Sequence, residues 1–264
     1  MPDFWSGVAR CWNSYGMSYL AGAGRTLLIS LVGTFIGCII GFAVGIVQTI
    51  PVGPNDSAAK RVLLKIVNII LRIYVEVFRG TPMIVQAVFI YYGLKMAFHL
   101  SMGMWNAAFL IVSINTGAYM AETVRGGILS VDPGQTEGAQ AIGMTHFQTM
   151  MNVILPQAFR NIIPQIGNNF IINIKDTSVL SVISITDLFF VHKSVVGALY
   201  LYFQSATIVM VIYLTMTLLA SWLLRLLEKH LDGSDSYDLA TTDTLAHTSG
   251  LVRFRGKKKE VLHR

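Results

Sequence analysis

Charged side chains are scarce in this sequence. Asp, Glu, Lys and Arg make up only 13% of its 264 residues, whereas soluble globular domains typically carry about 25% of these residues. Hydrophobic residues make up 53% of the chain, and its mean hydropathy is +0.58. This balance excludes an ordinary soluble domain and predicts an integral membrane protein, and the length favours a single domain.

Catalytic and metal-binding patterns are also missing. The two cysteines, Cys11 and Cys38, form no Cys-x-x-Cys or Cys/His ligand spacing, so we expect neither a disulfide framework nor a zinc site. No nucleophile–base pair or carboxylate pair forms a readable motif, so we expect no catalytic residues and no enzyme activity from this chain. A Gly-x-x-x-x-Gly-Lys-Ser/Thr phosphate loop is absent as well, so any ATP must be bound by another chain.

Most basic residues lie in two clusters of the sequence. Eight of the 20 Lys and Arg residues lie from Arg225 onward, and five more lie between Lys60 and Arg79. Such clusters between apolar segments are typical of cytoplasmic loops in membrane proteins. No nucleic-acid-binding motif accompanies the net charge of +6, so nucleic acid is not an expected partner. The basic end of the chain is instead suited to contact with anionic membrane lipid.

Five apolar segments predict an all-α, multi-pass membrane protein, because one helical span needs about 20 apolar residues. These segments are 26–50, 83–98, 105–124, 166–190 and 201–224. The short connections after the second and fourth segments contain a single basic residue, Lys193. The positive-inside rule therefore predicts an N-terminus outside and a C-terminus in the cytoplasm.

The chain divides into three regions on this interpretation. Residues 1–21 contain two Trp and two Tyr, which favours an external interfacial segment. Residues 22–228 form the membrane domain, with a long cytoplasmic loop at 125–165. Residues 229–264 form a polar and basic cytoplasmic tail.

A glycine repeat marks the first span. Gly33, Gly37, Gly41 and Gly45 recur at every fourth residue, and this spacing places them on one face of a helix. Small residues on one face allow a second helix to approach closely. We therefore interpret the repeat as a packing seam and not as a binding site.

Residues 61–79 carry a different pattern. Polar side chains recur at intervals of 4, 3, 4, 4 and 3 residues, at Arg61, Lys65, Asn68, Arg72, Glu76 and Arg79. This spacing predicts a helix with one narrow polar stripe, on which Arg72 and Glu76 can pair. Pro82 is expected to break or kink the helix. We interpret 62–79 as an interfacial or elbow helix, because a span there would place basic residues outside.

The loop at 125–165 has the pattern of a docking element. Asp132 and Pro133 predict a helix start, with Asp at the cap and Pro in the first turn. Gly143 is expected to end this short helix, and a second helix is expected to follow a turn and run to Pro156. Long loops in compact proteins are usually functional or disordered, and this loop is not of low complexity.

The same loop carries a motif. Glu137-Gly138-Ala139 is followed after three residues by Gly143, and after nine more by Val153, Ile154, Leu155 and Pro156. This arrangement resembles the cytoplasmic signature of ABC importer permeases, with Gly138 in place of Ala and Val153 in place of Ile. Further blocks resemble the polar amino acid uptake branch of that family, which serves histidine, glutamine, glutamate and arginine; they lie at 78–82, 117–126, 155–158 and 175–178. The resemblance covers about residues 20–228.

This resemblance implies the type I ABC importer permease fold. It implies the translocation subunit of an ATP-driven importer that carries a polar amino acid into the cytoplasm by alternating access, in a bacterial plasma (inner) membrane. The implied partners are a second permease copy or a related permease, two cytoplasmic ATPase subunits that hold ATP and Mg, and an extracytoplasmic substrate-binding protein. No cofactor is implied on this chain.

The resemblance also assigns roles to residues in the loop. Those that it implies couple the chain to the ATPase are Glu137, Gly138, Ala139, Gly143, Leu155 and Pro156. The small side chain of Ala139 is expected to allow close seating in a groove of the ATPase.

Polar residues inside the spans predict the substrate pathway. Ionisable groups within a membrane are costly and usually face a cavity or a partner. One interpretation is structural, with Lys175 paired to an acid and Glu122 reaching the inner surface. The other is a cavity for a zwitterion, with Asp176 near its amino group. The candidate pathway residues are Glu122, Asn169, Asn173, Lys175, Asp176, Thr177 and Ser178.

Three other functions are weighed against this one. A permease of the same branch for cystine or an opine fits the same motifs. A stand-alone secondary carrier usually has two repeats and more spans, and we find no internal repeat in this sequence. A membrane enzyme is disfavoured by the lack of a catalytic motif.

Overall fold

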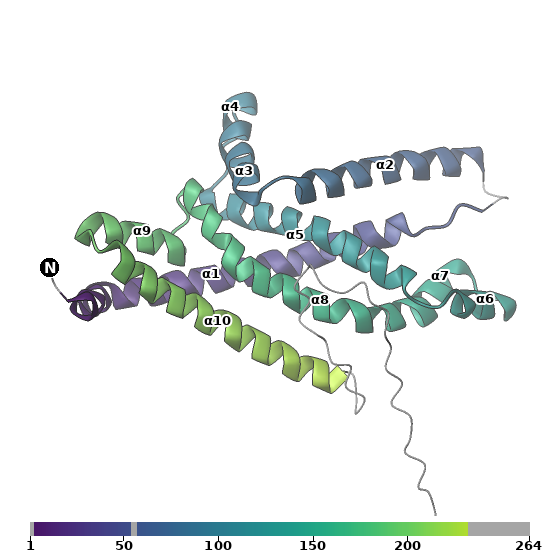
Figure 1. Cartoon of the computed structure of the whole chain (residues 1–264). Helices are drawn as coiled ribbons and strands as arrows, with labels where there is room; N and C mark the ends of the chain where they lie inside the picture. Colours follow the sequence, from purple (N-terminus) through teal and green to yellow (C-terminus); the bar gives the residue numbers. More distant parts are fainter. Residues whose placement is uncertain (1–2, 54–56, 232–264) are drawn as a thin grey trace, which may run out of the picture.

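A computed structural model describes residues 3–53 and 57–231, and within these residues the chain is helical and contains no strand (Figure 1). In chain order the helices are α1 (Phe4–Gln48), α2 (Ala58–Gly80), α3 (Met83–Val88), η1 (Phe89–Gly93), α4 (Leu94–Phe98), α5 (Met104–Leu129), α6 (Pro133–Ala141), α7 (His146–Thr149), η2 (Met150–Ile154), α8 (Leu155–Asp176), η3 (Thr177–Ile183), α9 (Leu188–Leu199) and α10 (Tyr202–Leu231). The segments η1 and η2 are π-helical, and η3 is a 3₁₀ helix. The predicted all-α class is confirmed.

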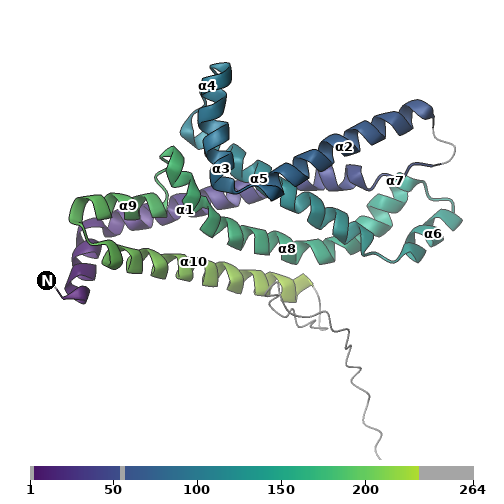
Figure 2. The same ribbon diagram turned by 45° about the horizontal axis from the view of Figure 1, so that its top comes forward.

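The long helices run side by side along one common direction. Figures 1 and 2 show α1, α5, α8 and α10 in this arrangement, with α6 and α7 at one end of the bundle and α9 at the other. We call these the loop end and the α9 end. A protein with spanning helices in this arrangement has its connecting elements on opposite sides of the membrane.

The glycine repeat is the seam between α1 and α5, the most extensively packed pair of helices in the described chain. Each glycine faces one residue of α5, at intervals of four on both helices. The facing pairs are Gly33 with Val112, Gly37 with Thr116, Gly41 with Met120 and Gly45 with Val124. The interpretation of the repeat as a packing seam is confirmed, because side chains at these positions would prevent so close an approach.

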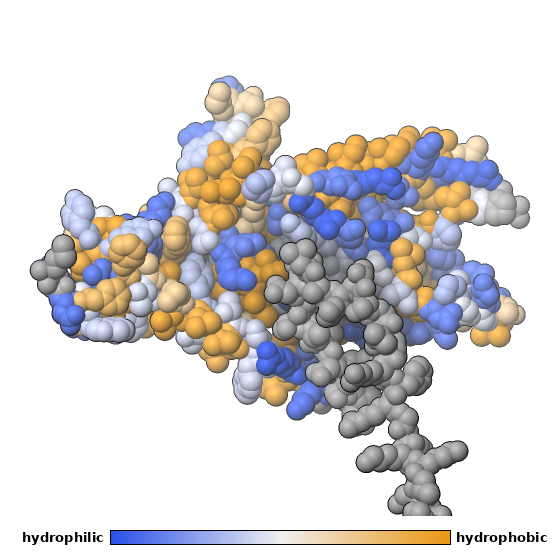
Figure 3. Space-filling model, viewed as in Figure 1, coloured by the Kyte–Doolittle hydropathy of each residue, from blue (hydrophilic) through white to orange (hydrophobic). Residues whose placement is uncertain are grey.

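Helix α2 begins where Ser57 caps it by accepting a hydrogen bond from the backbone N–H of Lys60 (3.3 Å). Its apolar side chains are exposed on the outer face, at Val62, Leu63, Ile66, Ile69, Ile70, Ile73 and Val77. In Figure 3 this face is the orange row along α2, and hydrophilic atoms lie beneath it, toward α5. An outward apolar face fits contact with lipid acyl chains. Asn68, Arg72 and Glu76 of the polar stripe line a cavity shared with α1 and α5, whereas Leu71, Tyr74 and Val75 make the apolar contact with those helices.

The position of α2 favours one of its two predicted interpretations. Figures 1 and 2 show α2 beside α5 and not across the end of the bundle, with α3 and α4 leaving at a steep angle. This arrangement is that of an elbow helix. The expected ion pair is not formed, since no salt bridge joins Arg72 to Glu76 within the described chain.

The break between α2 and α3 exposes backbone carbonyls that two buried amides satisfy. Gln86 donates from Nε2 to the carbonyls of Phe78 and Thr81, at 2.9 Å each. Asn115 of α5 donates to the carbonyl of Phe78 (3.2 Å) and to Oε1 of Gln86 (3.0 Å). Because an unpaired buried carbonyl is costly, this network fixes the elbow to α5.

Each of the five predicted apolar segments lies largely in helices. By length and composition, three described helices can cross a membrane alone: α1, α5 and Tyr202–Lys229 of α10. A fourth span is formed if His146–Ile183 and α9, which are bent by 52° at their break, are counted together. The apolar stretch Met83–Phe98 is shorter than these and continues from the elbow of α2.

Several predicted boundaries differ from those of the structure. The span expected at 166–190 is interrupted, because the helix ends at Ile183 and restarts at Leu188; Asp187 caps the new helix through the N–H groups of Phe189 and Phe190. The turn expected at 191–200 is wrong for the same reason, since α9 occupies most of it. Residues 4–21 are continuous with the first span, and the predicted tail lies outside the described residues from 232 onward.

Candidate coupling loop and translocation cavities

Helix α6 has defined signals at both ends. At its start the Asp132 carboxylate accepts a hydrogen bond from the N–H of Gly134 (2.7 Å), and Pro133 occupies the first turn. At its end Gly143 has φ +82°. The N–H of Met144 donates to the carbonyl of Ala139 (3.1 Å), and the N–H of Gly143 donates to that of Gln140 (2.9 Å). This pair of bonds is a Schellman cap, so both predicted ends of the helix are confirmed.

The second helix of the loop starts at a capping box. Thr145 accepts from the N–H of Gln148, whose side chain accepts from the N–H of Thr145 in return. The helix does not end at Pro156, as predicted from the sequence, but continues through the π-helical segment η2 into α8. Pro156 lies in the first turn of α8, and a π-helical turn before it relieves the usual conflict of proline with a preceding helical turn.

The loop is firmly attached to the bundle. A cluster of buried apolar side chains joins η2 and α8 to α5; it contains Met120, Val124, Ile128, Met150, Ile154, Leu155, Ala158 and Ile162. Two polar contacts add to it, from Asn161 to Ser130 (3.0 Å) and from Gln157 to Gln135 (3.3 Å). Helix α6 itself packs against η2, so its connection to α5 and α8 runs through this close-packed cluster.

The outer surface of the loop is exposed and partly apolar. Glu137 and Gly138 are exposed, and so are Ile142 (79%) and Phe147 (72%). Large apolar side chains exposed together at the tip of a loop are a feature of protein interfaces. Ala139 differs from the expectation, since it is only 6% exposed. Its small side chain packs inside the loop, and its role in seating the loop in an ATPase groove stays a prediction.

A polar cavity of about 400 Å³ lies between the end of α1, the stripe of α2 and α5. We call it the inner cavity; its lining is Gln48, Asn68, Arg72, Val75, Glu76, Glu122 and Arg125. Glu122 forms a salt bridge with Arg79 and lies 3.8 Å from Arg125. The guanidinium of Arg79 also stands over the ring of Tyr119, 5.6 Å from its centroid. Glu122 is thus held between α2 and α5.

Asn173 of the predicted pathway holds three helices together, whereas Asn169 and Thr177 bond to carbonyls of their own helical stretch. Asn173 is buried and donates to Thr34 (2.8 Å) of α1 and Thr116 (2.9 Å) of α5. Asn169 donates to the carbonyl of Gln165 (2.9 Å), and Thr177 donates to that of Ile174 (3.1 Å). These contacts already satisfy the groups that were expected to meet a substrate, so their place on the pathway stays a prediction.

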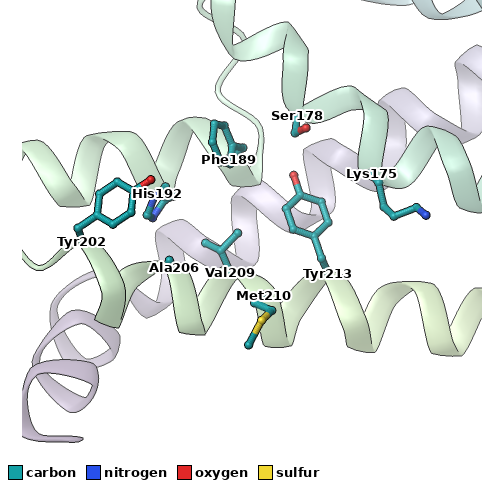
Figure 4. Close-up of a pocket in the computed structure, with 9 residues that line it drawn as sticks. All are labelled: Lys175, Ser178, Phe189, His192, Tyr202, Ala206, Val209, Met210 and Tyr213. Carbon is teal, nitrogen blue, oxygen red and sulfur yellow. The ribbon is translucent and has the colours of Figure 1, made fainter. Parts of the chain in front are cut away.

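The remaining pathway residues lie on an accessible face of α8 and η3. Lys175 and Asp176 are exposed on the surface of this single chain, and no salt bridge to Lys175 is formed within the described residues. Lys175 and Ser178 line a second cavity of about 400 Å³ between α8, α9 and α10. Figure 4 shows the hydroxyl of Tyr213 turned toward Ser178 in this cavity. Two of its lining residues, Lys175 and Ser178, are thus among those predicted from the sequence.

The other residues of this second cavity gave no signal in the sequence. His192 and Tyr202 line its far end (Figure 4). The ring of His192 is hydrogen-bonded to Ser205 (2.9 Å), which is bonded in turn to Tyr19 (2.7 Å). His192 was expected in a turn, so its burial could not be foreseen. Among the described residues, no group of three or more His, Cys, Asp or Glu is placed to hold a metal ion.

The apolar helical bundle, the attached and exposed loop and the two cavities between helices, one of them polar, are the features of a membrane permease. Residues 57–233 match the family described as "Binding-protein-dependent transport system inner membrane component". This match covers more than half of the chain, and the chain therefore belongs to that family. It is an ABC importer permease with a translocation role.

Individual relatives agree with this assignment. The glutamine transport system permease protein GlnP of Escherichia coli (strain K12) is 37% identical over 213 residues, which are 80% of this chain and 92% of that protein. The L-cystine transport system permease protein TcyB of Bacillus subtilis (strain 168) is 47% identical over 120 residues, 46% of this chain and 51% of that protein. A solved structure described as an amino acid ABC transporter with histidines is 35% identical, with a TM-score of 0.74 over 87% of this chain and 99% of that chain.

Proposed function

We propose that this permease imports a polar amino acid and that ATP hydrolysis on two partner subunits drives the transport. The observation that carries the proposal is the loop of α6 and α7, which exposes Ile142 and Phe147 at its tip and is anchored below by a buried cluster. An exposed tip joined to the spans by a buried cluster is suited to transmit the movement of a docked protein to the spans.

The mechanism is alternating access. Closure of the two ATPase subunits on ATP and Mg displaces the α6–α7 loop, and the shared packing of η2, α5 and α8 carries the displacement into the bundle. The spans then exchange between an inward-open and an outward-open arrangement, whose populations are set by differential binding of ATP and substrate. Glu137, Gly138 and Gly143 take part by shaping the docking surface, and Leu155 and Pro156 by joining it to α8.

Further chains complete the importer. A second permease copy, or a related permease, covers the face of α8 on which Lys175 and Asp176 are exposed, because charged groups facing lipid there would be costly. Lys175, Asp176 and Ser178 then face the pathway between the two permeases. An extracytoplasmic binding protein delivers the substrate at the α9 end, where the N-terminus lies outside a bacterial inner membrane. The C-terminus is cytoplasmic, on the same side as the loop end.

Uptake by the complete transporter tests the substrate class. The permease, purified with its ATPase and reconstituted in vesicles with the binding protein, is expected to accumulate a labelled polar L-amino acid only when ATP is present on the loop side. Glutamine, arginine, histidine, glutamate and cystine are assayed separately, and the relatives named above make glutamine and cystine the first two.

Each outcome of this assay has one meaning. Accumulation of one of these amino acids with ATP supports the proposal and names the substrate, and cystine would select the alternative within the same branch. Accumulation that follows a proton gradient and ignores ATP would instead identify a stand-alone carrier. No accumulation of any amino acid would contradict the substrate class.

A further inference from the structure

The inner cavity contains charged side chains that form no ion pair within the described chain. Glu122 is paired with Arg79, but neither Arg72 nor Glu76 forms an ion pair or a side-chain hydrogen bond within the described chain. Both line the inner cavity from α2, and Arg125 lines it from α5. The side chains of Arg72 and Glu76 are exposed at the cavity, so a ligand can reach both of them. The cavity therefore offers a positive and a negative group that no contact within the described chain uses.

A third group in the cavity also lacks a partner. The side-chain oxygen Oδ1 of Asn68 is buried and accepts no hydrogen bond. Buried polar atoms of proteins are hydrogen-bonded in the great majority of cases, and an exception calls for an explanation. An amide oxygen is an acceptor, so the missing partner is a donor. Asn68 stands two turns before Glu76 on the same stripe of α2.

We propose that the inner cavity is a binding site for the zwitterionic head of an amino acid. The guanidinium groups of Arg72 and Arg125 bind its α-carboxylate, and the carboxylate of Glu76 and the amide oxygen of Asn68 bind its α-ammonium. Arginine is well suited to carboxylate because it can donate two parallel hydrogen bonds. The site rests on the function proposed above and specifies it. It is separate from the pathway residues on α8.

Size and charge both fit this ligand. A volume of about 400 Å³ lies within the range of about 300–1,000 Å³ that is typical of small-molecule sites. The lining has two arginines, Arg72 and Arg125, and two glutamates, Glu76 and Glu122. A ligand with no net charge but two opposite ends leaves this balance unchanged, whereas a simple anion or cation would leave one pair of groups without partners.

The place of the site connects it to the coupling loop. Arg125 lies one turn before the end of α5 at Leu129, where the chain enters the loop, while Asn68, Arg72 and Glu76 lie on the elbow helix. The α-carboxylate is therefore held by two helices, through Arg72 of α2 and Arg125 of α5. A displacement of the loop that moves α5 relative to α2 withdraws the Arg125 contact and lowers affinity, which favours release at the loop end.

The test measures binding to the permease–ATPase complex without the binding protein, so that the permease alone decides the specificity. The probes are L-glutamine, glutaramate, which lacks the α-amino group, and 4-aminobutanamide, which lacks the α-carboxylate. Affinity is read from the ligand-dependent rise in the melting temperature of the complex. The variants are Glu76→Gln and Arg72→Gln, and the control is Lys65→Gln, which removes a charge from the same stripe outside the cavity.

The wild-type complex is expected to bind glutamine about tenfold or more tightly than either analogue, because each analogue loses one charge-assisted contact. Glu76→Gln is expected to remove the preference over glutaramate only, and Arg72→Gln the preference over 4-aminobutanamide only. Lys65→Gln keeps both preferences. A role of these charges in holding α2 to α5 alone would lower the melting temperature without changing the order of the ligands.

Two results would overturn the site. One is an unchanged order of affinities in both variants. The other is a wild-type complex that binds no glutamine while the complete transporter accumulates it. If the complete transporter carries another amino acid, that amino acid and its own two analogues replace the glutamine set. Absence of uptake for every amino acid is the separate failure of the proposed function.

Discussion

Replacement of Gly143 by valine is expected to reduce ATP-driven uptake about tenfold, because a β-branched residue in the left-handed region costs about 1–2 kcal/mol. Gly143 has φ +82°, and valine at that angle is strongly disfavoured. No atom lies within 4 Å of the position of an added side chain, so the effect is conformational and not a collision. A docking-competent loop that is less populated by this factor couples less often.

The control for this experiment is Gly143→Asn. Asparagine adopts the left-handed conformation more readily than other residues with a side chain, so it keeps the Schellman cap and most of the uptake. Both variants are expected to insert into the membrane at wild-type levels, since Gly143 lies at the exposed turn between α6 and α7. Equal uptake by the valine and asparagine variants would show that the angle of this turn has no part in coupling.

Replacement of Gly41 by alanine is expected to destabilise the bundle by about 1–3 kcal/mol, the usual cost of overpacking a well-packed contact. A methyl group on Gly41 would lie 2.3 Å from Cβ of Met120 and 2.8 Å from its carbonyl carbon. These atoms belong to or adjoin the backbone of α5 and cannot turn aside, so α1 and α5 must separate. The melting temperature of the purified chain in mild detergent measures the effect.

Gly24→Ala is the matched control, because Gly24 lies in the same helix with nothing within 4 Å of an added methyl group. The substitution gains intrinsic helix propensity of about 1 kcal/mol and is expected to keep or raise the melting temperature. Equal melting temperatures for the two alanine variants would show that the close approach of α1 and α5 at Gly41 does not contribute to stability.

Local signals in the sequence predicted much of this structure. The spacing of four between glycines has a direct meaning on a helix, and so the α1 seam was foreseen. Asp132, Pro133 and Gly143 likewise specify the ends of α6 through backbone geometry alone. The polar stripe of α2 was predicted from its helical period. The orientation of the stripe was not predicted, because a period does not show which face of a helix turns toward the protein.

Features that depend on contacts between distant segments were not predicted. The amides of Gln86 and Asn115 support the elbow, but neither residue stands out in its own helix. The start of a new helix at Leu188 depends on the cap at Asp187. One polar residue hardly changes the average hydropathy of an apolar segment, so this break was not predicted. The burial of Ala139 inside the loop was also not predicted, because it depends on the packing of η2 against α6.

The central claim is that a partner ATPase drives this permease through the exposed tip of the α6–α7 loop. The most direct measurement purifies the tagged chain from its native membrane in mild detergent and identifies the proteins that accompany it, for the wild type and for Ile142→Asp/Phe147→Asp. The account predicts a stoichiometric ATPase subunit with the wild-type chain and its loss from the variant, because the two apolar anchors are replaced by charges. A wild-type chain that is recovered without an ATPase under several detergents, or a variant that retains it fully, would contradict the account.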